Sequence, residues 1–386
     1  MLLAWLLAVA ACSTDKTDNT NKRATTTGKA KPAAPKCNSE IRQQNPSKLV
    51  LRKACSPYHV LSGGSLVVKD MVIEPGVTVV VADAAGVRVT GRLVAKGTAE
   101  APIQFVAKDS NTLWPGLSFD TRAKGQLEHA HINGAAAAKL GALYAKGGNE
   151  LQLRNVQFGL SAAQAKLRAK LNEGDANKAP TLVVNKLTGK SVFENVSGAY
   201  ARVAHAASIR YFKPNNRFDT IEIGHGTIRK PYRFHASQNY AIRQIEIHGT
   251  DSFRPVLTVE AGSKLRFIDG GHIQVRDAEL HVQGTKEKPV TMSPGPGSRT
   301  WEGLWFQKNG KGVLRYLEMT NARVVLKGSA RSIFVNEGAR LRAENVSVTG
   351  SKGYAITAGC RTKVNIDGLK LGAKDKRLEQ RPCPKK

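Results

Sequence analysis

One pattern occurs twice in this sequence, at positions nearly half the chain apart. The first copy reads Glu74-Pro-Gly, then Gly97-Thr, then Trp114-Pro-Gly-Leu. The second copy reads Glu260-Ala-Gly, then Gly284-Thr, then Trp301-Glu-Gly-Leu. The spacing between matching positions changes only once along the pattern, so the copies differ by a single insertion. Internal repetition in a Gly-rich chain predicts an architecture of stacked repeats.

The sequence between these motifs consists of short runs of β-branched residues, such as 66–68, 77–81 and 103–106, divided by Gly, Asp or Pro. Short strands with frequent turns fit a sandwich, a barrel or a coil of stacked rungs. Two further recurrences favour the coil. Asn-Val recurs after a charged residue, and Asn tolerates the left-handed backbone of a corner and can bond to its copy one rung away. Ile-Glu-Ile recurs at 221–223 and 245–247, about one rung apart.

With these motifs the sequence resembles the right-handed parallel β-helix family of bacterial secreted and surface proteins. The resemblance covers about residues 56–370, with duplicated units at about 56–160 and 254–350. It implies an all-β solenoid, 37–386, whose parallel strands stack about 4.8 Å apart around inward aliphatic side chains. One short inserted helix is expected near 162–173, because Ser161 and Gln164 have the spacing of a capping box. The insert is either a binding element or a tolerated insertion.

The N-terminus predicts export. Residues 2–11 are apolar but too few to span a bilayer, which indicates a cleaved signal peptide at 1–11. Val9-Ala-Ala-Cys12 resembles the lipobox of bacterial lipoproteins, although no Lys or Arg precedes the apolar run. The resemblance implies lipidation of Cys12 and, with Ser13 after it, an anchor in the outer membrane. Residues 12–36 contain no large apolar side chain and predict a disordered tether.

Four further cysteines lie at the two ends of the repetitive region, Cys37 and Cys55 at its head and Cys360 and Cys383 at its tail. An exported chain enters an oxidising compartment, so disulfides are favoured over metal binding. Pairing of near neighbours would place one disulfide at each end and add roughly 3 kcal/mol each to stability. The other two connectivities and free thiols stay open as alternatives.

Net charge points to anionic partners. The formal charge is +29, of which the tether contributes +4, so the body itself is strongly basic. Such a field attracts acidic polysaccharide, lipopolysaccharide phosphate, anionic lipid or nucleic acid. No stretch interleaves Lys or Arg with aromatic rings, which argues against nucleic acid. We therefore predict a binding or structural module for anionic surface polymer or polysaccharide; a basic composition with no particular partner is the alternative.

A polysaccharide lyase or glycosidase is the second functional hypothesis. If Ile-Glu-Ile stacks on its copy, Glu222 and Glu246 point outward on one face about 5 Å apart, which is the separation in a retaining glycosidase. His225 and His248 follow them closely and are candidate ligand-binding residues. The alternative is ordinary solvated surface, because alternation puts polar residues outward on any half-buried strand.

Three remaining signals are weaker. Arg229-Lys-Pro-Tyr-Arg233 resembles the Arg-x-Pro-x-x-Arg signature of pectate lyases but is one residue short, so both arginines are only candidate ligand contacts. Calcium would be required only under the lyase hypothesis, and no other cofactor is expected. His129 and His131 are a possible metal pair, but a site needs three or four ligands, so no metal is predicted. The repeated tryptophans of the duplicated motif fit packing at a corner better than a sugar platform.

Overall fold

The computed structural model describes residues 37–42, 46–135, 140–171, 180–326 and 329–383. The chain divides into two units, Met1–Lys36 and Cys37–Lys386. The predicted signal peptide, Cys12 and the tether belong to the first unit and lie outside the described residues. The described part of the second unit is all-β, as predicted, and its strands join in one sheet of 30 strands.

The strands of the first half are β1 (Glu40–Ile41), β2 (Lys48–Leu51), β3 (Tyr58–Val60), β4 (Leu66–Ile73), β5 (Thr78–Val81), β6 (Val87–Lys96), β7 (Ile103–Ala107), β8 (Leu117–Phe119), β9 (Lys124–Asn133), β10 (Leu143–Ala145), β11 (Glu150–Gly159), β12 (Leu182–Val184), β13 (Val192–Glu194), β14 (Ser197–His205) and β15 (Arg217–Ile228). Those of the second half are β16 (Tyr232–Phe234), β17 (Asn239–His248), β18 (Val256–Glu260), β19 (Lys264–Arg276), β20 (Glu279–Gln283), β21 (Val290–Pro294), β22 (Gly303–Gln307), β23 (Lys311–Thr320), β24 (Val324–Leu326), β25 (Ser329–Val335), β26 (Arg340–Thr349), β27 (Tyr354–Ala358), β28 (Lys363–Asp367), β29 (Lys370–Leu371) and β30 (Lys376–Gln380). The helices are η1 (Lys53–Cys55), α1 (Ala162–Leu171) and η3 (Ala206–Tyr211).

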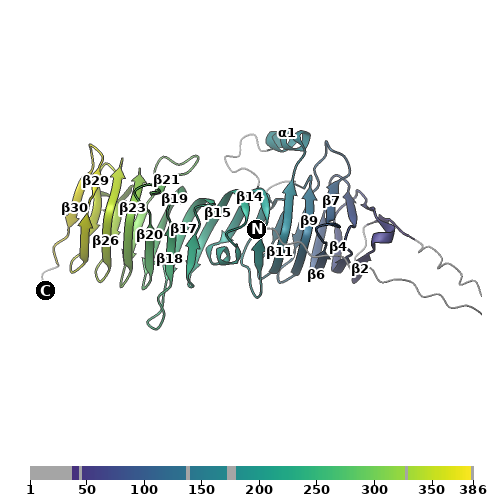
Figure 1. Ribbon diagram of the computed structural model, residues 1–386, viewed down its shortest axis with the longest axis horizontal. Helices are drawn as coiled ribbons and strands as arrows, with labels where there is room; N and C mark the ends of the chain where they lie inside the picture. Colours follow the sequence, from purple (N-terminus) through teal and green to yellow (C-terminus); the bar gives the residue numbers. More distant parts are fainter. Residues whose placement is uncertain (1–36, 43–45, 136–139, 172–179, 327–328, 384–386) are drawn as a thin grey trace, which may run out of the picture. The chain divides into compact units, whose positions relative to one another are not determined.

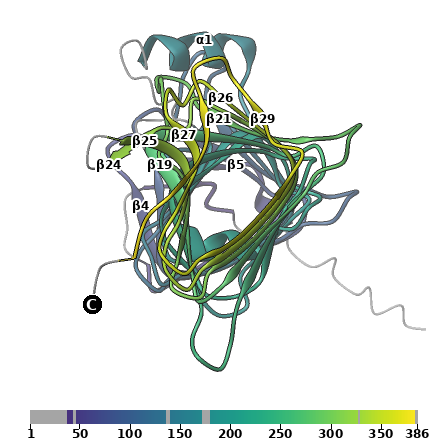
Figure 2. The same cartoon turned by 90° about the vertical axis from the view of Figure 1, so that its left-hand side faces the viewer.

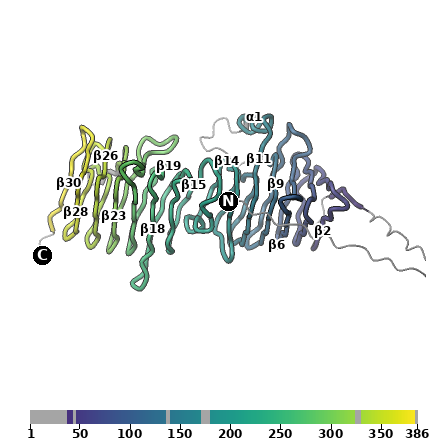
Figure 3. The backbone as a smooth tube through the Cα atoms, in the orientation of Figure 1, coloured from purple at the N-terminus to yellow at the C-terminus, as the bar shows by residue number. Residues whose placement is uncertain are grey.

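Neighbouring strands come from successive turns of the chain and run parallel. Leu117 of β8 pairs with Leu143 of β10, which pairs with Leu182 of β12. Figures 1 and 3 show the strands of this unit following one another in chain order, and Figure 2 shows them as the sides of a closed coil. One exception among the described strands is the antiparallel hairpin of β24 and β25. Backbone groups are therefore satisfied between turns rather than within a turn.

Aliphatic side chains fill the inside of the coil in aligned rows. One row consists of Leu66, Val87, Leu117, Leu143 and Leu182, each at most 1% exposed. Strand alternation sends every second side chain inward, so the same strands carry polar residues outward. Each fully buried aliphatic side chain of such a row contributes about 1.5–3 kcal/mol.

Asparagine forms the predicted corners. Asn155, Asn195 and Asn345 all have left-handed backbones, with φ of 53°, 51° and 53°. The side-chain amide of Asn195 donates to Oδ1 of Asn155 at 3.0 Å, one turn away. This bond ties two successive corners together, as the repeated Asn-Val motif predicted.

The duplicated Trp-x-Gly-Leu motif has one structural role in both copies. Trp114 and Trp301 are both 0% exposed, and each indole Nε1 donates to a backbone oxygen at 2.9 Å. Gly116 and Gly303 have positive φ, and a Cβ at either would overlap a carbonyl oxygen on the next turn. The motif is therefore a packing unit, in agreement with the interpretation favoured from sequence.

Both disulfides and the inserted helix are confirmed. Cys37 bonds to Cys55 and Cys360 bonds to Cys383, so near neighbours pair at each end. Helix α1 begins directly after Ser161, whose Oγ accepts from the Gln164 amide at 3.1 Å while Gln164 Oε1 accepts from the Ser161 amide at 2.9 Å. This reciprocal pair is the capping box that the spacing predicted.

The two copies do not continue the same ladders of strands. The ladder that contains β8 runs through β10, β12, β14, β15 and β17 to the first part of β19 and on to β21. The repeated motif, however, makes β22 the equivalent of β8, and β21 the equivalent of β7. The ladder of β7, β9 and β11 ends at 217–218 of β15, and a new one begins at 226–228 of the same strand. The ladder that holds β8 in the first copy therefore holds the equivalent of β7, and not of β8, in the second copy.

The close approach at Gly303 gives a stability prediction. In Gly303→Ala the new Cβ would overlap the Ser332 carbonyl oxygen, a backbone atom that cannot rotate away. We expect the free energy of unfolding to fall by on the order of 3 kcal/mol, from overlap and left-handed strain together. Gly297 has nearly the same φ, +80°, but nothing within 4 Å of its Cβ position, so Gly297→Ala should cost only about 1 kcal/mol. Equal losses in denaturant unfolding would contradict the packing role.

Candidate anion-binding site

The predicted pair of stacked carboxylates does not form. Ile221 pairs with Tyr240 rather than with Ile245, and Ile245 pairs with Gly226, so the two Ile-Glu-Ile segments are not in register. Glu222 lies beside Arg202 and Ala241, whereas Glu246 lies beside Thr227 and Gln274. The prediction was wrong because one turn of the chain here is shorter than the sequence interval between the two segments.

Glu222 is instead the centre of a buried ion network. Its side chain is 1% exposed. Arg243 Nε donates to Oε1 at 2.8 Å, Arg202 Nε donates to Oε2 at 3.1 Å, and the Tyr200 hydroxyl donates to Oε2. Arg243 also pairs with Asp269. Burial alone would raise the pKa of Glu222, but the hydrogen bonds from Tyr200 and Arg243 and the two guanidinium charges outweigh it and lower the pKa. A carboxylate this enclosed is positioned for stability rather than for contact with a substrate.

Glu246 and His248 lie together on β17, one turn from Arg276. Thr227 Oγ1 donates to Glu246 at 3.2 Å, and His248 Nδ1 lies 3.7 Å from Glu246 Oε1. Arg276 Nη1 lies 3.9 Å from the same oxygen. His225 is exposed and pairs in register with His205. The structure therefore separates the Glu222 and Glu246 halves of the predicted site.

The arginines of the lyase-like segment do not converge on a carboxylate cluster. Arg233 pairs with Glu260 at 3.5 Å, and Arg229 is exposed in the turn before β16. His129 occupies a corner with φ of 45°, where its Nε2 lies 3.1 Å from the amide of Asn155. Within the described ranges, no three His, Cys, Asp or Glu side chains come together as a metal site.

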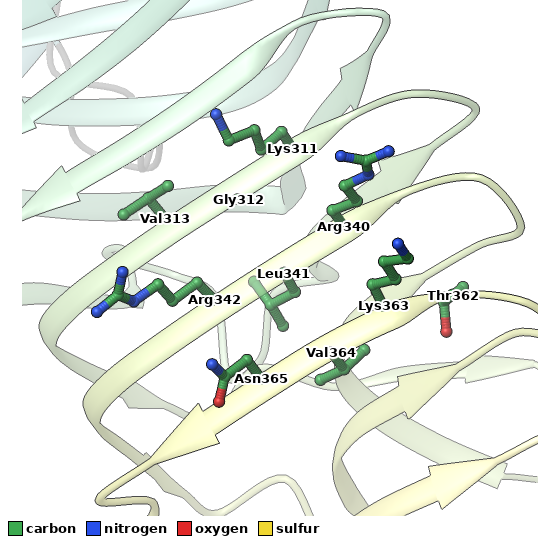
Figure 4. A pocket seen from close by; sticks show the side chains of 10 residues that line it. All are labelled: Lys311, Gly312, Val313, Arg340, Leu341, Arg342, Thr362, Lys363, Val364 and Asn365. Carbon is green, nitrogen blue, oxygen red and sulfur yellow. The ribbon is translucent and has the colours of Figure 1, made fainter.

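A row of cations crosses three neighbouring strands near the C-terminal end of the unit. Lys311 of β23 pairs in register with Arg340 of β26, which pairs with Lys363 of β28. Figure 4 shows these three side chains following one another across the strands, with Val313, Arg342 and Asn365 as a second row. They line an open pocket of about 660 Å³, a size in the range of ligand sites. We call Lys311, Arg340 and Lys363 the cation row.

Only the first member of the cation row is neutralised. Lys311 Nζ donates to both oxygens of Glu279, at 3.2 and 3.3 Å. Partial burial would raise the pKa of Glu279, but hydrogen bonds from His281 and Lys311 lower it, so this carboxylate is ionised at neutral pH. Arg340 and Lys363 are exposed, and in the part of the chain that the structure describes their side chains make neither an ion pair nor a hydrogen bond. Two adjacent cations are thus left open to solvent.

The first copy has a carboxylate at the position of Arg340. There Lys124, the equivalent of Lys311, pairs in register with Glu150 at 3.7 Å. In the second copy Arg340 occupies the place of Glu150, so cation faces cation. Like charges directly opposite on neighbouring strands destabilise a sheet by about 0.2–1 kcal/mol. The duplicated fold does not require a cation at position 340, because the first copy forms the equivalent strand pair with Glu150 in that place.

Sequence reasoning missed the cation row although it recognised the duplication. Its members lie far apart in sequence, and only the strand register brings them side by side. Aligning Asn155 with Asn345, the corners of the two copies, would have exposed the change from Glu150 to Arg340. The net charge pointed to an anion, but not to a place.

No protein-family model, no curated protein and no solved structure matches this chain. Among the described residues, no helix has the length and apolar character needed to cross a membrane. Any proposal for the function of this protein therefore rests on the geometry of the site.

The network around Glu222 predicts a pH-dependent stability. Its pKa in the folded state lies below the usual 4.5, so its stabilisation is complete above that value and is lost as the pH falls through the folded pKa. Glu222→Gln should lower the free energy of unfolding near neutral pH by on the order of 2–3 kcal/mol, because it removes the charge that holds two partly buried guanidinium groups.

Urea unfolding of both proteins from neutral to acid pH checks this. The difference in free energy of unfolding between wild type and Glu222→Gln should become smaller below pH 4.5. The control is Glu194→Gln, because Glu194 also pairs with an arginine but is 41% exposed. That exposed pair should contribute less than about 1 kcal/mol. A similar loss in both variants would contradict the buried network.

Proposed function

We propose that this protein is a binding module for an acidic polysaccharide of the cell envelope, held through the cation row. Arg340 supplies a planar fork that suits carboxylate or sulfate, and Lys363 supplies a compact charge beside it. A linear acidic polymer that crosses the strands would meet both. The observation that carries the proposal is the pair of unneutralised cations, Arg340 and Lys363, that face each other in register, with Arg340 at the position where the first copy has the carboxylate of Glu150.

Electrostatics support a bound anion at this place. Two facing cations repel each other in the free protein, and an anion between them removes the repulsion and adds charge-assisted hydrogen bonds. Charge-assisted bonds of this kind contribute about 1.5–3 kcal/mol each. The charge of the whole chain, +29, would also raise the local concentration of a polyanion.

The scaffold that we propose is a right-handed parallel β-helix. Parallel pairing between successive turns, aligned inward aliphatic rows and asparagine corners support it. A disulfide at each end of the unit would protect the terminal turns, where unpaired strand edges would otherwise recruit other chains.

Placement at the outer membrane is part of the same proposal. The lipobox-like residues before Cys12 support cleavage and lipidation at that cysteine, with residues 13–36 as a tether. Multiple acyl chains on one cysteine would anchor the protein stably. Retention of incorporated labelled fatty acid in wild type, and its loss in Cys12→Ser, would test the anchor separately from binding.

Removing the two open cations of the cation row should weaken binding of the acidic polysaccharide. In Arg340→Gln/Lys363→Gln, the affinity for alginate or polygalacturonate should fall at least about tenfold, since two charge-assisted contacts are lost. The matched control is Arg217→Gln/Lys264→Gln, which removes the same charge from exposed positions on β15 and β19. Affinities measured by calorimetry should differ little between this control and wild type.

Three results would overturn or redirect the proposal. Equal loss in both double variants would show attraction to net charge alone. Binding to lipopolysaccharide phosphate but to none of the acidic glycans would change the ligand. Unsaturated product or new reducing ends, with or without calcium, would establish a lyase or glycosidase instead.

A further inference from the structure

Trp305 differs from the other tryptophans of the described unit. Trp114 and Trp301 are 0% exposed and belong to the core. Trp305, on β22, is on the outer side of the strand, between the inward residues Leu304 and Phe306, and is partly exposed. An indole on the outside of a sheet adds nothing to the interior, so its position calls for another explanation.

Two contacts fix the orientation of the Trp305 ring. Its Nε1 donates to the Glu302 carbonyl at 2.8 Å. One ring face stacks on His272, with ring centroids 4.8 Å apart and planes 9° from parallel. His272 Nδ1 in turn lies 3.0 Å from the Glu302 carboxylate. Burial lowers the pKa of His272 against the opposing effect of Glu302, so the ring beneath Trp305 is uncharged at neutral pH. The indole is therefore held in place before any ligand arrives.

Polar groups with unused hydrogen-bonding capacity border the indole. Gln274 pairs in register with Trp305, and Arg276 pairs with Gln307. Both glutamines are partly exposed, and within the described residues their side chains make no hydrogen bond, apart from any to solvent. The guanidinium of Arg276 is partly exposed, and its Nη1 lies 3.9 Å from Glu246 Oε1. These amide and guanidinium groups place donors and acceptors beside a flat apolar surface.

The neighbouring aromatic residue shows what a covered ring looks like on this face. Phe334 of β25 pairs in register with Trp305. The guanidinium groups of Arg331 and Arg381 lie over its ring, 5.3 and 5.8 Å from the centroid. In the described part of the chain no cation lies over Trp305 in this way. Trp305 is thus the aromatic residue of this pair that a ligand can reach.

We propose that Trp305, Gln274, Arg276 and Gln307 bind one pyranose ring of a glycan, by stacking on the indole. A sugar ring presents an apolar C–H face and a rim of hydroxyl groups, and these match an aromatic plane bordered by amides that both donate and accept. This site requires no charge on the sugar. It also lies on a different strand ladder from the cation row, so it goes beyond the anion-binding function and stands independently of it.

Intrinsic fluorescence of the full-length chain tests the proposal, because the two core tryptophans are shielded and Trp5 is the same in wild type and in the Trp305 variant. Neutral hexasaccharides of glucose, mannose, xylose and N-acetylglucosamine would be titrated in about 0.5 M sodium chloride, which screens the cation row. We expect a saturable change in emission with at least one of them. Trp305→Phe should abolish the change in emission. No response to any sugar in the panel would overturn the proposal.

Variants separate stacking from folding. Trp305→Ala should lower the affinity for the sugar about tenfold in equilibrium dialysis. Gln274→Ala/Gln307→Ala should also lower this affinity, although the indole is intact. Tyr144→Ala removes another partly exposed aromatic residue, on β10, and should leave the affinity unchanged. If Trp305→Ala fails to fold, the glutamine variant decides the result. Unchanged affinity in both site variants would overturn the proposal, whereas Arg340→Gln/Lys363→Gln should bind the neutral sugar normally.

Discussion

Backbone hydrogen bonding between successive turns of the chain is the constraint on which the rest of this structure depends. Each turn finds its partners one turn before and one turn after, so residues far apart in sequence become fixed neighbours at the spacing of adjacent strands, about 4.8 Å. Each side chain therefore lies directly beside the side chains at the paired positions of the turns before and after it. Aliphatic side chains give a continuous core, asparagines give bonded corners, and cations give a row of positive charge.

The shift of ladders between the two copies explains why the middle of the unit carries a buried ion network. A slip of one residue would move a whole strand's inward side chains to the outside. Aliphatic rows resist such a slip only weakly where one ladder ends and another begins, as happens within β15. Glu222 resists it strongly, because displacement from Arg202 and Arg243 would leave its own buried carboxylate unpaired. Burying this network costs solvation, but it discriminates among registers that an apolar contact would accept.

Local signals in the sequence predicted local structure well. The capping box of Ser161 and Gln164, the near-neighbour disulfides and the left-handed asparagines each depend on a few residues whose chemistry has one favourable geometry. The all-β character followed from the density of short β-branched runs. The sequence did not predict which residues of adjacent turns pair with each other, because this pairing depends on the number of residues in each turn. The turn from Ile221 to Tyr240 is short, whereas the turn from Leu143 to Leu182 is much longer because it contains α1. The assumption of a fixed rung length therefore placed Glu246 beside the wrong residues. It also could not predict which side chains lie beside Arg340, Lys363 and Trp305.

The duplication separates what the scaffold needs from what it carries. The buried Trp and the Gly that meets a neighbouring carbonyl are kept in both copies, and any change at either would disturb packing between turns. The difference that creates the cation row lies outward, where Glu150 in one copy corresponds to Arg340 in the other. A facing pair of cations destabilises the sheet by at most about 1 kcal/mol, which a long ladder of backbone bonds tolerates. A rigid array of turns can therefore hold like charges at a fixed spacing, whereas flexible loops would let them drift apart. This property suits the array to the repeating, charged ligand that we propose.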